Sequence, residues 1–109
     1  MKNINEIRNI FISYFIKKKH FLAKSSSLIS NTKDLLFTNS GMNQFKFFFY
    51  NNNNIKYKKL VNCQRCLRVG GKYNDLNNIG FSNKHNTFFE MLGNFSFNDY
   101  FKEESIYMA

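Results

Sequence analysis

Proline and tryptophan are absent from this sequence of 109 residues, and alanine occurs only twice, at positions 23 and 109. Asparagine, lysine, isoleucine and phenylalanine, whose codons are rich in A and T, are abundant instead. This bias indicates an AT-rich genome. Part of the excess of lysine is then mutational drift, so the net charge of +9 does not by itself identify an anionic partner such as nucleic acid or nucleotide phosphate.

Apolar runs long enough to cross a bilayer are also absent. The apolar run IFISYFI at residues 10–16 is too short, and no signal-peptide cleavage site follows it. Apolar residues in this region recur instead at helical spacing, and Asn3 and Glu6 stand three apart, as in a capping box. The sequence therefore predicts an amphipathic helix over residues 4–18, in a cytoplasmic protein without a membrane partner.

Cysteine occurs only at Cys63 and Cys66, which form a C-x-x-C pair. A zinc site needs two more ligands, and the two histidines, His20 and His85, lack the paired spacing of such ligands. A redox pair normally opens a helix in a βαβ unit, whereas this pair falls in a strand-like run. We therefore predict that the pair binds no metal, with a small zinc module as the alternative.

Two stretches with strand character, 60–69 and 86–92, flank a segment rich in glycine and asparagine. This pattern predicts two antiparallel strands joined by a long loop over residues 70–84. The Gly-Asn pair at 93–94 is expected to end the second strand. A further strand is expected at residues 35–37, and the apolar segment MNQFKFFFY that follows is expected to be helical or extended.

The loop between the two predicted strands carries charged residues beside glycines. Arg68 precedes two consecutive glycines, and Lys72 and Asp75 follow them. Glycines let the backbone approach a ligand closely, and these charges can grip a polyphosphate together with a metal or an amine. The loop lacks the Gly-Lys-Ser/Thr sequence of a P-loop. A solvated hairpin loop without a ligand is the alternative interpretation.

Six aromatic rings gather between residues 86 and 102, and Glu90 lies within the apolar run that carries them. On a strand, Phe89 and Glu90 point to opposite faces. One face packs on the core, and a ring on the other face can stack on a planar base, a contact that contributes ~1–3 kcal/mol. Burying an unpaired carboxylate is costly, so we expect Glu90 near the surface, or paired with Arg65, Arg68 or a ligand. The alternative is that most of these rings are core residues.

Four segments resemble the N-terminal part of the alanyl-tRNA synthetase family: EIRNIFISYFIKKKHFLAKSSSL, LLFTNSGMNQFK, QRCLRVGGKYNDLNNIG and HNTFFEMLGNFSFNDYFK. The second and fourth are long and peculiar to that family. The resemblance implies a class II aminoacyl-tRNA synthetase, which uses ATP and Mg²⁺ to form alanyl-adenylate and then transfers alanine to the 3′ end of tRNA(Ala). The implied fold class is α+β, an antiparallel sheet flanked by helices.

The resemblance also implies catalytic residues. Arg68 matches the motif 2 arginine that holds the α-phosphate of ATP. A fixed guanidinium at that position stabilises the negative charge that builds up on the phosphoryl oxygens when the alanine carboxylate attacks. Lys72 and Asp75 match loop positions that assist adenylate formation.

The other implied ATP-binding residues follow the loop. His85 and Phe89 match the class II pattern of a basic residue followed four positions later by phenylalanine, whose ring would stack on adenine. Glu90 is implied to line the same region. With Arg68, these three residues form the ATP-binding set that the resemblance implies.

The resemblance is not complete. The prolines that the family carries after SSSL are missing here, Cys63 stands where the family usually has serine, and Asn86 replaces a histidine. Residues 1–109 correspond to the N-terminal part of the catalytic domain, before motif 3. The alanine pocket and the zinc site of the editing domain are expected outside them, so the chain alone should not aminoacylate tRNA. The alternative function is an inactive, basic nucleic-acid-binding remnant.

Overall fold

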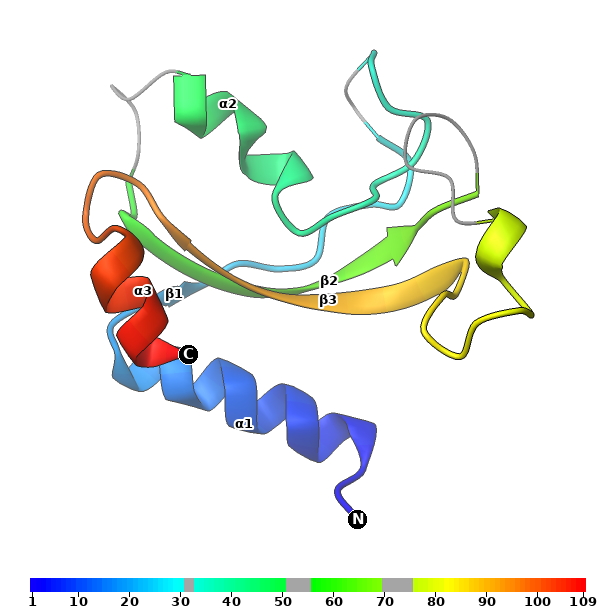
Figure 1. The fold of residues 1–109 in the computed structure, drawn as a ribbon. Helices are drawn as coiled ribbons and strands as arrows, with labels where there is room; N and C mark the ends of the chain where they lie inside the picture. The colour runs from blue at the N-terminus through cyan, green and yellow to red at the C-terminus, as the bar shows by residue number, and fades with distance from the viewer. Residues whose placement is uncertain (31–32, 51–55, 70–75) are drawn as a thin grey trace.

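The computed structural model describes residues 1–30, 33–50, 56–69 and 76–109 (Figure 1). The described residues form helices α1 (Ile4–Lys17), α2 (Lys46–Tyr50) and α3 (Lys102–Met108), strands β1 (Phe21–Leu22), β2 (Lys59–Leu67) and β3 (Phe88–Ser96), and the 3₁₀ turns η1 (Asn43–Phe45) and η4 (Leu76–Asn78). The three strands form one sheet in the order β1-β2-β3. The combination of separate helices and a mainly antiparallel sheet confirms the predicted α+β class.

Strands β2 and β3 form the antiparallel hairpin that the sequence predicts (Figure 1). Their register runs without a break from the pair Lys59–Ser96 to the pair Leu67–Phe88. At the other edge of β2, the two residues of β1 pair in parallel. Part of the predicted connecting loop, residues 70–75, lies outside the described residues.

Helix α1 begins with the predicted capping box. The side chain of Asn3 accepts a hydrogen bond from the backbone N–H of Glu6 at 2.9 Å, and the Glu6 carboxylate accepts one from the backbone N–H of Asn3 at 3.0 Å. These bonds satisfy N–H groups that the first turn of a helix otherwise leaves without a partner. The helix ends at Lys17, one residue before the predicted end.

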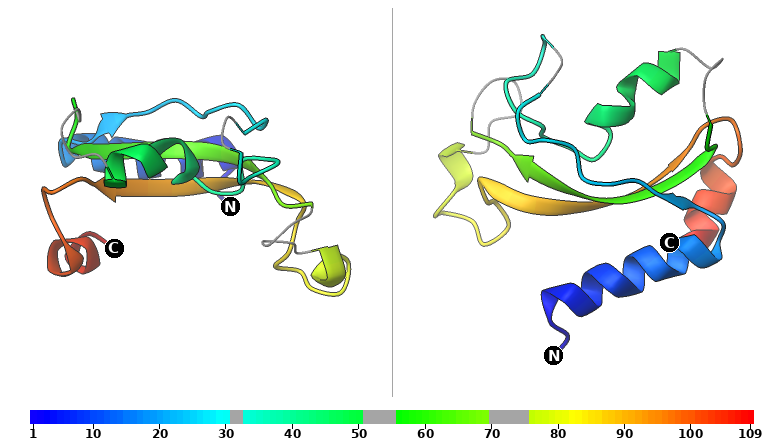
Figure 2. Two further views of the ribbon diagram at one scale, coloured as in Figure 1. Left: turned by 90° about the horizontal axis from the view of Figure 1, so that it is seen from above. Right: turned by 180° about the vertical axis from the view of Figure 1, so that it is seen from behind.

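The two faces of the hairpin have different partners. Figure 2 shows α1 along one side of the sheet and α2 on the other. Residues opposite each other in register share a face, so Leu60 and Phe95 lie together. They pack with Phe45 and Phe97 into a cluster of apolar side chains on the side of α2. This cluster, with Phe45 and Phe97 each 4% exposed, is the main core of the described residues.

The second strand is longer than predicted. We expected the Gly-Asn pair at 93–94 to end it, but β3 continues through both residues to Ser96. A Cβ atom on Gly93 would lie 2.7 Å from the ring of Phe95 and 3.0 Å from Oδ1 of Asn62. The prediction was wrong because this glycine gives space to neighbouring side chains and does not form a turn.

The strand expected at residues 35–37 does not form. Within the described part of this segment, pairing is limited to one isolated bridge between Ile29 and Phe37. The reason lies in Thr38, whose N–H donates to the carbonyl of Leu28 at 2.8 Å while its carbonyl accepts from the N–H of Leu67 at 2.9 Å. The backbone thus divides its hydrogen bonds between two segments and crosses the end of β2. The segment after it is helical, in η1 and α2.

None of the helices in the described ranges is both long enough and apolar enough to cross a membrane. The longest of them, α1, has 14 residues, whereas a membrane-spanning helix needs ~20.

A buried histidine joins α1 to the segment after β3. His20 is 4% exposed. Its Nδ1 lies 3.1 Å from the carbonyl oxygen of Phe15, which can only accept, so Nδ1 carries the proton and Nε2 accepts from the hydroxyl of Tyr100 at 2.7 Å. That hydroxyl accepts in turn from Nδ2 of Asn94 at 3.1 Å. The network suits a neutral imidazole, and burial lowers the pKa of His20 below its ordinary value.

We expect His20 to make the folded chain sensitive to acid. Because its pKa is lower in the folded chain than in the unfolded one, its contribution to stability is complete above the ordinary pKa of 6.5 and is lost as the pH falls through the folded value. Urea unfolding of the wild type and of His20→Gln, repeated at neutral and acid pH, measures this contribution. The stability difference between the two proteins should shrink towards acid pH. A difference independent of pH would contradict the expectation.

Candidate functional site

Arg68 directly follows β2 and is half-buried. Its backbone N–H donates to the carbonyl of Thr87 at 2.8 Å, which extends the pairing of the hairpin beyond the strands. Its Nε donates to the carbonyl of Asn39 at 3.1 Å. The guanidinium carbon also lies 5.3 Å from the centre of the Phe89 ring. These contacts hold a cation in a defined place at the end of the hairpin.

The ring of Phe89 is half-buried on the same face of the hairpin as Cys66, its partner in register. A guanidinium held over an aromatic ring contributes ~0.5–2 kcal/mol, depending on how far it is removed from water. The structure thus brings together two residues that the family resemblance assigns to ATP, Arg68 and Phe89. An arginine and an aromatic ring side by side offer donors for a phosphate and a flat surface for a base.

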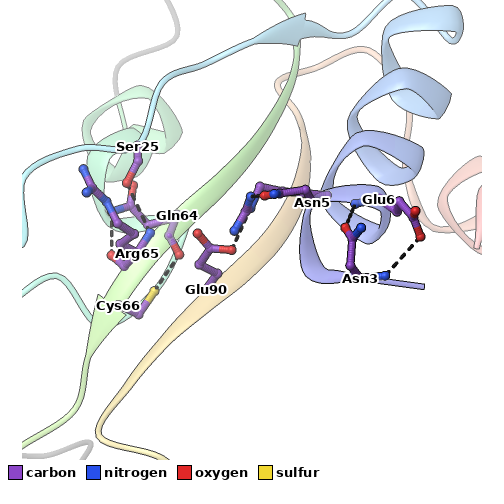
Figure 3. A network of polar contacts seen from close by, with 9 residues as sticks. Asn3, Asn5, Glu6, Ser25, Gln64, Arg65, Cys66 and Glu90 are labelled. Atoms are coloured by element: carbon purple, nitrogen blue, oxygen red, sulfur yellow. Dashed lines mark hydrogen bonds and ion pairs between the residues drawn. The ribbon is translucent and has the colours of Figure 1, made fainter. Parts of the chain in front are cut away.

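Glu90 lies next to Phe89 on β3 and therefore on the opposite face of the strand. Figure 3 shows it pointing toward α1. Its Oε2 accepts a hydrogen bond from Nε of Arg8 at 2.8 Å, and the two groups form an ion pair. This bond holds the pKa of the Glu90 carboxyl below its usual range. We expected Glu90 near the surface, or paired with Arg65, Arg68 or a ligand. It is paired, but the hydrogen-bonded partner is Arg8, so the named partners were wrong. Arg65, which stands opposite Glu90 in register, contributes through its charge, which also lowers the pKa of Glu90. Phe89 and Glu90 therefore serve opposite faces of β3, as the alternation of a strand requires.

Of the remaining predicted site residues, the structure describes His85 only. Nδ1 of His85 lies 3.0 Å from the hydroxyl oxygen of Ser82, within the turn that leads into β3. The same hydroxyl accepts from the backbone N–H of Lys84 at 3.2 Å, so Ser82 organises this turn. Lys72 and Asp75 lie outside the described residues, and their roles stay predictions.

Cys63 and Cys66 lie three residues apart on β2, so their side chains point to opposite faces. Strand geometry separates their Cα atoms by ~10 Å, too far for a disulfide or a shared metal ion. Burial raises the pKa of the Cys66 thiol to about 11, and burial and the Glu90 carboxylate raise the pKa of Cys63. Among the described residues, no three His, Cys, Asp or Glu side chains gather as a metal site.

The turn at residues 38–43 also belongs to the site, and the sequence analysis assigned it no functional role. It supplies the carbonyl of Asn39 to Arg68. Oδ1 of Asn43 accepts from the backbone N–H groups of Asn39 at 3.0 Å and Ser40 at 2.7 Å. Two asparagines four residues apart around a glycine are a signal for such a closed turn, because short amide side chains readily bond to nearby backbone groups.

Residues 6–109 match the family described as tRNA synthetases class II (A). The chain belongs to this family. The match covers α1 from residue 6 onward, the whole β2–β3 hairpin and α3, so the hairpin that carries Arg68 and Phe89 belongs to a class II synthetase domain.

Curated relatives of this class II synthetase chain include three proteins named alanine–tRNA ligase. The one from Wigglesworthia glossinidia brevipalpis is 59% identical over 110 residues, which are 100% of this chain and 13% of the relative. The one from Buchnera aphidicola subsp. Schizaphis graminum is 55% identical over 99% of the chain. The one from Legionella pneumophila is 56% identical over 96% of the chain. The chain spans 12–13% of the length of these relatives.

Proposed function

We propose that residues 1–109 are the N-terminal part of the aminoacylation domain of an alanine–tRNA ligase. The observation that carries the proposal is the 59% identity, over 100% of the chain, to the Wigglesworthia relative of that name. Alanine, ATP and tRNA(Ala) are then the substrates of the whole enzyme. Because charged tRNA is used in protein synthesis, the proposal places the enzyme in the cytoplasm.

Arg68 is the residue that we assign to the first chemical step. A carboxylate oxygen of alanine attacks the α-phosphorus of ATP, the new O–P bond forms, and the bond from the α-phosphorus to the bridging oxygen breaks to release pyrophosphate. Negative charge grows on the α-phosphoryl oxygens during this step. A guanidinium already held by Asn39 and Phe89 can stabilise that charge without first having to be ordered.

The other site residues take supporting roles in this proposal. Phe89 offers a ring for adenine, with His85 preceding it in the class II pattern. Lys72 and Asp75 act from the loop on adenylate formation and near the acceptor end of the tRNA. Glu90, which pairs with Arg8 on the opposite face, holds α1 against β3 in this proposal and is not assigned a contact with ATP.

Mg²⁺ accompanies ATP in the class II synthetase reaction. Magnesium is usually bound through one or two carboxylates, phosphate oxygens and water, and it neutralises phosphate charge. The described residues contain no cluster of three acidic, histidine or cysteine side chains. We assign Arg68 to the phosphate and none of the described residues to the metal.

A chimera tests the proposed function. The 109-residue chain replaces the matching 110 residues of the Wigglesworthia relative, so that the remaining 87% of that protein supplies the parts beyond it. We expect this chimera to exchange labelled pyrophosphate into ATP in the presence of alanine, and to charge tRNA(Ala). Omitting alanine is the control. A folded chimera that exchanges no pyrophosphate, beside a 109-residue chain that binds tRNA by itself, would favour the nucleic-acid-binding remnant instead.

A further inference from the structure

The side chain of Asn43 closes a turn back onto the residues before it. Its Oδ1 accepts three hydrogen bonds, from the backbone N–H of Asn39 at 3.0 Å, the backbone N–H of Ser40 at 2.7 Å and the hydroxyl of Ser40 at 3.2 Å. These donors lie in a part-buried region, where a lost acceptor is not fully replaced by water. This oxygen closes the turn from residue 39 to residue 43, together with the backbone N–H of Asn43, which donates to the carbonyl of Ser40 at 3.3 Å, and Nδ2 of Asn62, which donates to the carbonyl of Gly41 at 3.2 Å.

One peptide plane connects this turn to Arg68. The carbonyl of Asn39 and the N–H of Ser40 belong to the same peptide group, which is planar, so the orientation of one fixes the other. The N–H end donates to Asn43, and the carbonyl end accepts from Nε of Arg68 at 3.1 Å. Asn43 thus sets the direction in which the carbonyl of Asn39 points.

Both ends of the turn are anchored to rigid parts of the fold. On one side, the carbonyl of Thr38 accepts from the N–H of Leu67, the last residue of β2, and the Thr38 hydroxyl donates to the carbonyl of Ser27 at 2.7 Å. On the other side, Asn43 opens η1, whose Phe45 is buried in the core. The peptide plane that holds Arg68 is therefore tied through Asn43 to the apolar core.

We propose that Asn43 is a positioning residue, whose side-chain oxygen holds the Asn39–Ser40 peptide plane so that its carbonyl keeps the Arg68 guanidinium in place for adenylate formation. The inference rests on the proposed function, because it requires that Arg68 act on ATP. In this inference Asn43 acts on Arg68 through the Asn39–Ser40 peptide and not on the substrate itself. It acts by reducing the freedom of the guanidinium before the substrates bind, which matters because small displacements of a charge-stabilising group lower rates strongly.

Two substitutions of Asn43 in the chimera separate the effect of its side-chain oxygen from the effect of its side-chain size. Asn43→Leu keeps the shape of the side chain but removes the acceptor, whereas Asn43→Asp keeps an oxygen at the same place. We expect Asn43→Leu to lower kcat for pyrophosphate exchange roughly 10-fold to 10²-fold with a smaller change in the KM for ATP. Asn43→Asp should stay close to the wild type. A mere requirement for a side chain of this size would instead predict similar kcat values for Asn43→Leu and Asn43→Asp.

Gln44→Leu is the matched control. Gln44 also lies in η1, and its Nε2 donates to the carbonyl of Lys24 at 3.2 Å and to Gln64 Oε1 at 3.1 Å, but not to the Asn39–Ser40 peptide. Gln44→Leu should lower the melting temperature of the chimera but should not lower kcat for pyrophosphate exchange as Asn43→Leu does. If Asn43→Leu fails to fold, Asn43→Gln, which displaces the amide oxygen by one methylene, replaces it in the same assays with the same expected loss.

The decisive measurement repeats Asn43→Leu in an Arg68→Ala background. If Asn43 acts through Arg68, the substitution should cost little there, because the group it positions is gone. Two results would overturn the inference and leave the proposed function intact. The first is an equal loss of kcat on Asn43→Leu in both backgrounds. The second is wild-type kcat in folded Asn43→Leu when Arg68→Ala is strongly impaired. Normal exchange in Arg68→Ala, or no exchange in the unmodified chimera, would instead overturn the function assigned to the site.

Discussion

Arg68→Ala in the chimera is expected to lower the rate constant of alanine-dependent pyrophosphate exchange by about 10²–10³-fold, or roughly 3–4 kcal/mol of transition-state stabilisation. Alanine removes a half-buried guanidinium that Asn39 and Phe89 hold in place before ATP binds. Because the charge on the α-phosphoryl oxygens is greatest in the transition state, the loss should fall mainly on kcat, with a smaller rise in the KM for ATP.

Two further variants define what the site requires of this residue. Arg68→Lys keeps the charge but loses the planar group that bonds to Asn39 and lies over Phe89, so it should restore only part of the rate. Lys72→Ala should cost less than Arg68→Ala, because we expect an ammonium group in the loop to be less preorganised than an arginine next to a strand. Near-normal exchange in folded Arg68→Ala would identify Arg68 as a structural residue of the hairpin.

Phe45→Ala is expected to lower the free energy of unfolding of the chain by about 3–5 kcal/mol. The Phe45 ring is 4% exposed and lies 4.9 Å from the ring of Phe95 and 6.1 Å from that of Phe97, measured between centroids. Removing it leaves a cavity between η1 and the sheet. Since small domains are stable by only ~5–15 kcal/mol, a loss of this size is a large part of the total. Urea unfolding followed by circular dichroism measures it.

Phe47→Ala provides the comparison. Phe47 lies two residues away in α2, is of the same residue type and is 62% exposed. Its replacement should change the free energy of unfolding by less than ~0.5 kcal/mol, as expected for a surface position. Similar losses in the two variants would show that the cluster around Phe45 is not the main core of the chain.

Local signals in the sequence predicted the elements that depend on neighbouring residues. Helix α1 was found from apolar spacing and from Asn3 and Glu6, which bond to each other. The β2–β3 hairpin was found from two β-like runs around a segment rich in glycine and asparagine. The placement of Phe89 and Glu90 on opposite faces followed from the alternation of a strand. Each of these features can be predicted from residues that are close together in the chain, or from residue types that recur at a regular spacing.

Contacts between distant parts of the chain could not be predicted in this way. Arg8 and Glu90 are 82 positions apart, and no pattern in either segment indicates that α1 would lie beside β3 at that point. The sequence wrongly predicts a turn at Gly93 because the neighbours of this glycine in space, Phe95 and Asn62, are known only after β2 and β3 are paired. The sequence does not predict the role of the Asn39 carbonyl for the same reason, since Arg68 reaches it from the end of β2, 29 positions away.

The adjacent positions of Phe89 and Glu90 have a consequence for folding errors. A slip of one residue in the pairing of β2 with β3 would exchange the two faces of β3. Glu90 would then lie on the side of Arg68, and the attraction between the two charges would favour the misaligned hairpin. Arg8 counteracts this error, because its ion pair with Glu90 forms on the α1 side of the sheet, which Glu90 leaves when the pairing slips by one residue. Helix α1 therefore acts as a check on strand alignment, and a chain without it should populate misaligned hairpins in which Phe89 and Arg68 are separated.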